Sequence, residues 1–382
     1  MEYKRQVIEL MTLILVFLAT NPVQSLRLIS PSHQERMLAN SINKSVVMSF
    51  QTSYGDIFDC VEIYKQPAFD HPLLRHHSIQ MEPSVNITKL INRAEKKTTT
   101  QVIPNNVECP LGSVPIKRVP KQDLLQTKSL VMDGDEELEQ IAALLVPANI
   151  SEIHGRLNVW QPNAQMKQFS AAYIYAASQD GSVSNIVSVG WAVNTYDYTE
   201  NYTRLFGFWT KDSEKTSGCI DVRCPGFVQV SRKITLGMRI QEVSTYDGPQ
   251  HDIVLDLAQD HSTRNWWVTF GTEKVGYYPK ELFTTLVNGG TRGGWGGQVN
   301  TPPNESYPAL GSGHFPNEGF QKSCYISDMK MVDISGKLID PDQTKLKEYN
   351  TKPECFKVSY IGYSDPGLGN HMFLGGPPTC KP

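Results

Sequence analysis

The C-terminal half of the chain is a long succession of short segments with strand character, and this pattern constrains the fold more than any other feature. From about Gly155 onward the segments are rich in Val, Ile, Tyr, Phe and Trp and are separated by Gly, Asp, Asn or Pro. Ile253, Leu255 and Leu257 take alternate positions, which is the pattern of a half-buried strand. So many short strands favour an all-β fold, an antiparallel β-sandwich of jelly-roll type. We expect strands at residues 169–177, 186–193, 204–209, 226–230, 238–243, 251–257, 265–270 and 324–332.

Residues 26–150 have a different composition and are expected to form a smaller, mixed pro-region with a linker. Residues 26–50 have weak helical periodicity, and alternation after Gly55 predicts a strand around residues 57–63. Residues 83–135 are polar, which is typical of a mobile connector open to proteolysis. The acidic segment from Asp135 to Leu145 fits either a helix or an acidic linker, and the sequence leaves both open. The sandwich domain is then expected at residues 155–382.

The N-terminus has the layout of a secretory signal peptide. Lys4 and Arg5 precede an apolar run from Leu10 to Ala19, and small residues follow up to Ser25. A membrane-spanning helix needs about 20 apolar residues, and this run is too short. We therefore predict a signal peptide at residues 1–25, a secreted extracellular protein and no membrane anchor. Five Asn-x-Ser/Thr sequons agree with export and are the predicted glycosylation sites: Asn43, Asn86, Asn149, Asn201 and Asn304.

Seven cysteines fit the oxidising environment that a secreted protein meets. Two pairs are close in sequence in the C-terminal half, and a third pair would lie in the pro-region, although spacing alone does not fix the connectivity. The expected disulfides are Cys219–Cys224, Cys355–Cys380 and Cys60–Cys109, with Cys324 unpaired. The chain lacks the Cys-x2-Cys spacing of zinc sites, so we expect neither a metal nor a cofactor. A net charge of −3 gives no electrostatic basis for binding nucleic acid.

Ordered motifs in both halves of the chain resemble the plant neprosin-like proteins. The segment from Gly55 to Pro72, GDIFDCVEIYKQPAFDHP, is similar to the activation-peptide signature of that family. The resembling motifs in the C-terminal half are LNVWQP (157–162), VGWAV (189–193), RLFGFWTKD (204–212), GCIDVRCPGFVQ (218–229), VGYYPKELF (275–283), WGGQV (295–299), GSGHFP (311–316) and LGGPPTC (374–380). The resemblance implies a signal, an activation peptide and a β-sandwich peptidase. We expect the N-terminal segment to cover the groove until it is cut between about residues 115 and 155, a stretch whose polar character favours cleavage. The implied activity is cleavage around proline at acidic pH by a pair of glutamates.

Both expected glutamates are replaced in this sequence. Such a pair works because one carboxylate takes a proton from the attacking water while the other stays protonated and assists the carbonyl or the leaving amine. The family motif I-E-x-G-W puts Ser188 at the first position, and the motif G-G-E-V puts Gln298 at the second. Neither side chain ionises usefully at neutral or acidic pH. The carboxylate pair is therefore absent from the two positions where the resemblance places it.

Other residues of the domain offer alternatives for catalysis and for the groove. Ser188 lacks a nucleophile-elbow pattern, so a serine mechanism is not expected. For the groove we name Trp191 and Trp295, with core packing as the alternative, and Trp295 is favoured because glycines surround it. His314 is either a groove residue or a histidine satisfied in a turn. Six acids in this domain could replace the glutamates if the catalytic acids are displaced, and the alternative is that they are solvated residues of strands or turns. They are Glu242, Asp252, Asp256, Glu273, Glu281 and Glu318.

Two functions from different classes follow from this sequence. The first is a secreted prolyl endopeptidase of the neprosin type whose activity is impaired because both glutamates are replaced. The second is an inactive binding protein that holds proline-rich or glycan-bearing cell-wall polymers in an aromatic groove. The expected partners are therefore such a polymer or peptide, together with the protein's own pro-region.

Overall fold

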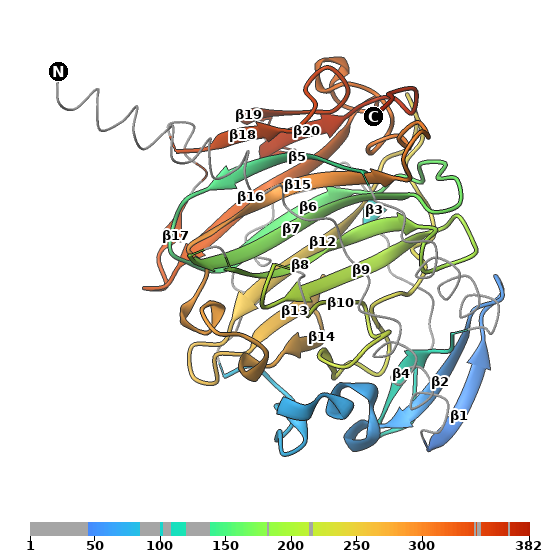
Figure 1. Ribbon diagram of the computed structural model, residues 1–382, viewed down its shortest axis with the longest axis vertical. Coiled ribbons are helices and arrows are strands. Elements are labelled where there is room, and N and C mark those ends of the chain that lie inside the picture. The colour runs from blue at the N-terminus through green and yellow to red at the C-terminus, as the bar shows by residue number, and fades with distance from the viewer. Residues whose placement is uncertain are drawn as a thin grey trace.

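Two large sheets pack face to face as a sandwich, and a small N-terminal module lies beside them (Figure 1). The computed structural model describes residues 45–84, 100–101, 108–119, 138–181, 183–213, 217–339, 341, 345–365 and 367–382. Among the described strands every pair is antiparallel except the short pair of β3 (Thr100–Gln101) with β12 (His251–Gln259). The predicted all-β antiparallel sandwich is therefore confirmed.

The seven-stranded sheet has the order β10–β9–β8–β7–β15–β5–β18. Its long strands pair without irregularity, so residues opposite one another can be read directly from the register. Its strands are β5 (Leu138–Val146), β7 (Phe169–Asp180), β8 (Val183–Asn194), β9 (Thr203–Thr210), β10 (Cys219–Ile220), β15 (Arg292–Thr301) and β18 (Lys347–Asn350).

The ten-stranded sheet has the order β11–β14–β13–β12–β6–β16–β20–β19, with β17 beside β16 and β3 beside β12. It covers the inner side of the seven-stranded sheet. Its further strands are β6 (Ile150–Asn158), β11 (Val228–Gln229), β13 (Trp266–Phe270), β14 (Glu273–Tyr278), β16 (Cys324–Asp333), β17 (Leu338–Ile339), β19 (Lys357–Asp365) and β20 (Gly369–Gly375).

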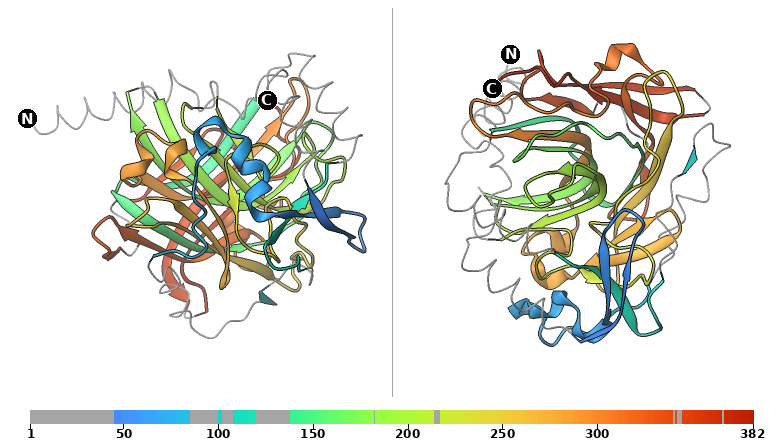
Figure 2. Two further views of the ribbon diagram at one scale, coloured as in Figure 1. Left: turned by 90° about the horizontal axis from the view of Figure 1, so that it is seen from below. Right: turned by 90° about the vertical axis from the view of Figure 1, so that its right-hand side faces the viewer.

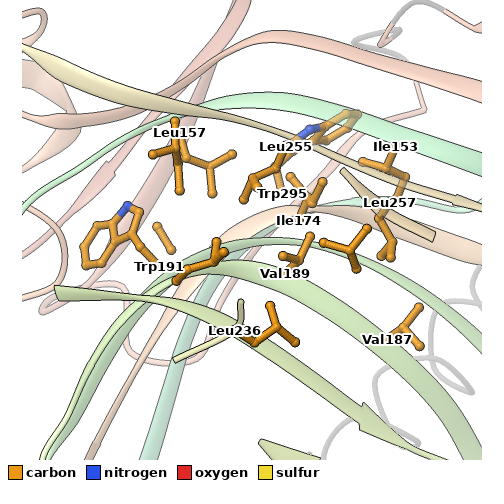
Figure 3. Packing of buried hydrophobic residues seen from close by; sticks show 14 of the residues in the cluster. Ile153, Leu157, Ile174, Val187, Val189, Trp191, Leu236, Leu255, Leu257 and Trp295 are labelled. Atoms are coloured by element: carbon orange, nitrogen blue, oxygen red, sulfur yellow. The ribbon is translucent and has the colours of Figure 1, made fainter. Parts of the chain in front are cut away.

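The core fills the space between the two sheets, because alternate side chains of each strand point inward. Val187 and Val189 of β8 face Leu255 and Leu257 of β12, and all four are fully buried (Figure 3). Burying one such aliphatic side chain is worth about 1.5–3 kcal/mol. We call the other side of the strands in the seven-stranded sheet its outer face; its side chains point away from this core.

Most of the expected strands are present, and the differences have physical causes. Residues 238–243 form no strand and contribute an isolated bridge at Arg239. β15 was not expected because it contains four glycines at 293, 294, 296 and 297. In this sheet the glycines are needed, since a Cβ on Gly294 would lie 1.9 Å from the carbonyl oxygen of Leu144. A glycine-rich strand can therefore occupy the middle of a sheet where its neighbours approach closely.

The predicted helix or acidic linker at residues 135–145 is wrong from residue 138 onward, because Leu138–Val146 is strand β5. β5 lies between β15 and β18 and buries Ile141 to Leu144, so pairing and burial override its helix-forming composition. The sandwich thus includes residues that the sequence suggested belong to the pro-region. The predicted weak helix at 26–50 lies outside the described residues up to residue 44, and Val46–Gln51 is strand β1. Most of the predicted connector at 83–135 also lies outside them, but the prediction is wrong for Ser113–Lys117, which is the buried strand β4.

The N-terminal module comprises residues 45–84 and 108–119 and sits at one edge of the sandwich (Figure 2). Its three-stranded sheet contains β1, β2 (Ile57–Glu62) and β4 (Ser113–Lys117), followed after β2 by the short 3-10 turns η1 (Ile63–Lys65), η2 (Pro67–Asp70) and η3 (Pro72–Leu74). The three predicted disulfides are present, with Cα–Cα distances of 5.5, 5.9 and 5.7 Å, and Cys324 is a buried free thiol. None of the described residues belongs to a helix with the length and apolar character that a bilayer crossing requires.

Candidate functional site

Ser188 and Gln298 both point to the outer face of the seven-stranded sheet. Their neighbours in sequence, Val187, Val189 and Val299, are fully buried in the core, and alternation puts the two polar side chains on the opposite side. Ser188 and Gln298 are 5% and 9% exposed, so both are nearly covered in the uncut chain. The two positions that the resemblance singles out therefore share one face.

The register separates the two positions by a defined offset. Ser188 lies opposite Tyr175 of β7, whereas Gln298 lies opposite Ala171 of the same strand. With strands about 4.8 Å apart and residues about 3.4 Å apart, the offset is about 10 Å across the sheet and about 14 Å along it. Tyr173 projects between the two positions. The positions 188 and 298 therefore lie on either side of Tyr173 in the register.

Glycines on both sides give the Tyr173 ring its space. Gly190 of β8 and Gly296 of β15 lie directly opposite Tyr173 on the two neighbouring strands. A Cβ on Gly190 would come within 2.8 Å of the Tyr173 Cβ. The two positions directly beside Tyr173 therefore have no side chains.

Aromatic side chains form the rest of the outer face near Ser188. Ser188 lies between Tyr175 and Phe208, which are its direct cross-strand neighbours. Tyr173 and Tyr175 are half-buried and make an edge contact with ring centroids 6.1 Å apart. Burial raises the pKa of Tyr175 well above its usual value, so this phenol stays protonated. A buried apolar cluster adjoins these rings and contains Phe169, Ala171, Ala192, Tyr196, Phe206 and Phe208, with the partly buried Tyr173 and Ile220 packed against it.

The side chains at both family positions on this face, Ser188 and Gln298, are polar and uncharged. The Gln298 side-chain amide donates from Nε2 to Asn300 Oδ1 at 2.8 Å, so its carbonyl oxygen is oriented away from Asn300. Neither Ser188 nor Gln298 supplies an ionisable group. The two side chains can donate and accept hydrogen bonds, but they cannot divide the roles of base and acid.

The six acids considered as displaced catalysts lie elsewhere in the structure. Asp252 and Asp256 are on the ten-stranded sheet, where Asp252 pairs with Arg156 at 2.7 Å and Asp256 with His154 at 2.7 Å. The remaining four are held at loops or strand ends by partners of their own, Glu242 by His251, Glu273 by Ser231, Glu281 by His77 and Glu318 by His314. The register of the seven-stranded sheet contains none of these six acids.

One acid that the sequence did not single out does lie on the outer face. Glu139 of β5 is directly opposite Asn300, and Gln298 is opposite Ile141, so Glu139 and Gln298 are diagonal neighbours on one side of the sheet. Diagonal positions are about 7–8 Å apart, within reach of two long side chains. Glu139 is half-buried, and together with burial its charge raises the pKa of Tyr349 on β18. Glu139 was not predicted to lie on this face because the segment was expected to form a helix or a linker.

Trp191 and Trp295 do not line a groove, and this expectation is corrected. Both indoles point into the sandwich core and are fully buried among aliphatic side chains (Figure 3). Trp191 Nε1 donates to the Asn158 carbonyl at 2.9 Å, and Trp295 Nε1 donates to the His154 carbonyl at 2.9 Å. The indoles therefore connect the two sheets by a hydrogen bond as well as by packing.

His314 lies in a loop at the end of the sandwich and not on the outer face. Its Nδ1 is 2.9 Å from Glu318 Oε1, and its ring is tilted against Tyr246 with centroids 4.2 Å apart. Its side chain is 38% exposed. The structure thus favours the satisfied turn histidine over the groove residue.

Two family models match the chain. The neprosin activation peptide matches residues 49–152, and neprosin itself matches residues 166–377, which is more than half of the chain. The chain belongs to the neprosin family. Ser188 and Gln298 both lie within the neprosin match, whereas Glu139 lies within the activation-peptide match. The activation-peptide match therefore extends into β5 and β6 of the neprosin sandwich.

Solved structures with some similarity to this neprosin-family chain share little sequence with it. Scytalido-glutamic peptidase with a transition-state analogue is 10% identical, covers 62% of this chain and 97% of its own, and has a TM-score of 0.37. SCP-B, an Eqolisin-family peptidase in complex with the tripeptide Ala-Ile-His, is 10% identical over 62% of this chain and 96% of its own, with a TM-score of 0.34. CG-16, a homodimeric agglutinin from chicken liver, is 7% identical over 44% and 95%, with a TM-score of 0.21.

Proposed function

We propose that this protein is a secreted member of the neprosin family in which hydrolysis by a glutamate pair is lost, and that its outer face binds extended proline-rich chains. The observation that carries the proposal is the pair Ser188 and Gln298 on one face, where the family positions call for two acids. Family membership supplies the peptidase-type scaffold. The replacement of both acids removes the proton transfers that such a scaffold would use.

The aromatic character of the outer face supports binding of proline-rich chains. Proline-rich segments adopt the extended polyproline II conformation, and aromatic-lined surfaces recognise them with a small entropic cost. Tyr173 and Tyr175 provide rings at alternate positions of one strand, and Phe208 provides a third beside Ser188. Ser188 and Gln298 then serve as hydrogen-bond donors to the carbonyls of the bound chain. Glycan-bearing polymers present apolar sugar faces to the same kind of rings.

Access to the face is part of the proposal. Ser188 and Gln298 are nearly buried in the uncut chain, so a polymer binds only after the face is uncovered. The expected cut lies between about residues 115 and 155; β4 ends at Lys117 and β5 begins at Leu138, and a cut within either paired strand would disrupt a sheet. We propose that the maturation cut falls between these two strands.

Export is supported by the predicted signal peptide, the three disulfides and the positions of two sequons. Asn149 and Asn304 are exposed in turns, where a glycan can be attached without disturbing the core. Asn201 is engaged, since its Nδ2 donates to Asn163 Oδ1 at 2.8 Å. Asn43 and Asn86 lie outside the described residues. Glycosylation at Asn149 and Asn304 is therefore the part of the proposal that mass spectrometry of the secreted protein checks first.

A second candidate function is slow peptide hydrolysis by Glu139 together with Gln298. The diagonal placement of the two side chains favours it. The Glu139 carboxylate would take a proton from water, and Gln298 Nε2–H would donate to the developing oxyanion. One such donor is worth about 10²–10³ in rate. The missing general acid, worth about 10²–10⁴, keeps the expected rate far below that of a glutamate pair.

The test compares the natural protein with five variants on a fluorescent proline-rich peptide at acidic pH, each before and after the maturation cut. The variants are Glu139→Gln, Gln298→Glu, Tyr173→Ala and the double variants Ser188→Glu/Gln298→Glu and Gln298→Glu/Glu139→Gln. The proposal expects the cut natural protein to bind the peptide in fluorescence anisotropy and to leave it intact in mass spectrometry. Cleavage by the natural protein that disappears in Glu139→Gln establishes the second candidate instead.

The single variant Gln298→Glu separates the two candidates further. With one introduced carboxyl and no partner, turnover stays negligible. If Glu139 faces the same substrate, the new glutamate forms a carboxyl pair with it, and cleavage appears in Gln298→Glu but not in Gln298→Glu/Glu139→Gln. Cleavage by the double variant Ser188→Glu/Gln298→Glu shows that the family positions are assigned correctly. If every variant still binds the peptide, including the one without the Tyr173 ring, the outer face is not the binding surface.

A further inference from the structure

The N-terminal module closes the open edge of the ten-stranded sheet with a side chain. β11 is the terminal strand of that sheet, and its outward side has no strand partner among the described residues. The side-chain amide of Gln66 takes that place. Gln229 N donates to Gln66 Oε1 at 2.7 Å, and Gln66 Nε2 donates to the Gln229 carbonyl at 3.0 Å. Gln66 is only 1% exposed, so this contact is part of the interior and not a surface touch.

Apolar side chains of the module belong to the same core as the sandwich. Leu74 is fully buried within the main apolar cluster, and Ala68 of η2 packs with Trp267 and Tyr277 in a second cluster. His71 makes an edge contact with Trp209, with centroids 5.8 Å apart. Removing the module would expose these aromatic rings on a protein that keeps them covered. Large exposed apolar patches of this kind are rare on soluble monomers.

A buried ionic contact joins the module to β9. Arg204 is 2% exposed, and its guanidinium binds Asp56 of the module with both nitrogens, at 2.6 and 3.1 Å. Lys117 of β4 reaches the same carboxylate at 3.1 Å. The Tyr198 ring lies beside both cations, 4.5 Å from Arg204 Cζ and 5.0 Å from Lys117 Nζ. A buried arginine needs such a carboxylate, because an unpaired charge in the interior is strongly unfavourable.

The module is also fastened at its far end. Gln80 Nε2 donates to Asp260 Oδ2 at 2.7 Å, and Gln80 Oε1 accepts from Thr263 Oγ1 at 2.8 Å and from Asn265 Nδ2 at 2.9 Å. The Tyr277 hydroxyl is 2.8 Å from His77 Nε2. The contacts thus extend from β9 of one sheet to the β12–β13 turn of the other, along the whole edge of the sandwich.

From these contacts we infer that the N-terminal module is a permanent part of the mature protein, which stays bound as a separate chain after the cut between β4 and β5. The module caps the edge of the sandwich, and its described contact with the outer face is at Arg204, near the start of β9. The rows that contain Ser188 and Gln298 lie on β8 and β15. The module can therefore stay in place while that face acts. This inference does not depend on the proposed function, since it concerns retention and not binding or turnover.

The experiment places a recognition sequence for a specific protease between residues 120 and 137 of the full chain. Complete cutting is verified on a denaturing gel, and the cut protein is then analysed by gel filtration and native mass spectrometry at neutral pH. We expect both pieces to elute together as a one-to-one complex. Elution of the sandwich without the module overturns the inference.

Hydrogen exchange gives a second measurement that does not require the cut. The Gln229 amide hydrogen is bonded to the Gln66 side chain, so its protection reports docking directly. We expect this amide to exchange as slowly as the amides of β8 in the uncut protein, and to stay protected after cutting. If the Gln229 amide exchanges faster than the amides of β8, the module opens separately from the sandwich and the inference is overturned. Gln66→Ala should remove the protection of Gln229, whereas Asp59→Asn, whose contacts with Arg118 and Ser49 lie within the module, should leave it unchanged.

Discussion

Asp56→Asn is the change whose effect follows most directly from the structure. The substitution removes the charge that faces Arg204 while it keeps the size of the side chain. Asp56 and Arg204 are 6% and 2% exposed, so the guanidinium cannot turn to water for compensation. Removing one partner of a buried ion pair costs about 3–5 kcal/mol. Glu200 lies 3.3 Å from Arg204 Nη2 and retains part of the compensation, so we expect a loss of about 2–4 kcal/mol in the free energy of unfolding.

The measurement is guanidinium unfolding followed by tryptophan fluorescence at neutral pH. Asp59→Asn is the matched control, because Asp59 pairs with Arg118, whose side chain is 48% exposed. Exposed pairs are worth about 0–1 kcal/mol, so the control should stay within that range. Equal losses in Asp56→Asn and Asp59→Asn would show that the Arg204 contact does not stabilise the fold as argued.

The same variant has a pH signature. Burial opposes the ionisation of Asp56, but the hydrogen bonds and charges of Arg204 and Lys117 outweigh burial and hold its pKa below the usual 3.8. A carboxyl with a depressed pKa stabilises the fold above its unfolded pKa, and this contribution is lost as the pH falls through the lower, folded value. The natural protein should therefore lose more stability than Asp56→Asn when the pH is lowered below 3.8. Parallel pH curves for the two proteins would contradict this assignment.

Three further predictions concern other parts of the molecule. Burial disfavours charge on His154, but Asp256 and Asp328 outweigh burial and raise the pKa of His154 to about 9. The stabilising contribution of His154 is therefore full below pH 6.5 and is lost as the pH rises through about 9. His154→Gln should reduce this loss of stability at alkaline pH, as measured by chemical unfolding. Trp295→Phe leaves a buried carbonyl without its donor and should lower the free energy of unfolding by about 1–3 kcal/mol. Tyr173→Ala should weaken peptide binding by about 0.5–1.5 kcal/mol in anisotropy titrations, whereas Tyr363→Ala, at a 66% exposed tyrosine of β19, should leave binding unchanged.

The sandwich could be predicted because apolar and polar residues alternate clearly along most of its strands. β5 could not be predicted, because its composition favours a helix. The segment LEQIAALLV contains Leu, Glu, Gln and Ala, which all favour helix in isolation. Its structure is decided by β15 and β18 on its two sides, which no local rule includes. The wrong assignment of β5 is also the reason that Glu139 was not predicted on the outer face. Strand propensity depends on neighbours more than helix propensity does, and here the neighbours are more than 140 residues away in sequence.

The placement of Trp191 and Trp295, in contrast, was within reach of the sequence. Ser188 and Trp191 are three residues apart, and so are Trp295 and Gln298. In an uninterrupted strand an odd separation puts two side chains on opposite faces. If Ser188 and Gln298 face the substrate, then both tryptophans must face the core, as the structure shows. The glycines around Trp295 indicated close approach correctly, but the approach is of neighbouring strands and not of a ligand.

This alternation also explains how a peptidase scaffold can lose its acids without losing its fold. Glutamates at positions 188 and 298 would be nearly buried carboxyls, and burial of a carboxyl disfavours its charged form. Ser188 and Gln298 avoid that cost, while Val187, Val189 and Trp295 on the other side of the same strands preserve the contacts between the sheets. Removing a costly catalytic group commonly stabilises a protein at the expense of its activity. The proposed binding function rests on this division: the aromatic rings of the outer face would still hold a chain, whereas Ser188 and Gln298 supply no ionisable pair for hydrolysis.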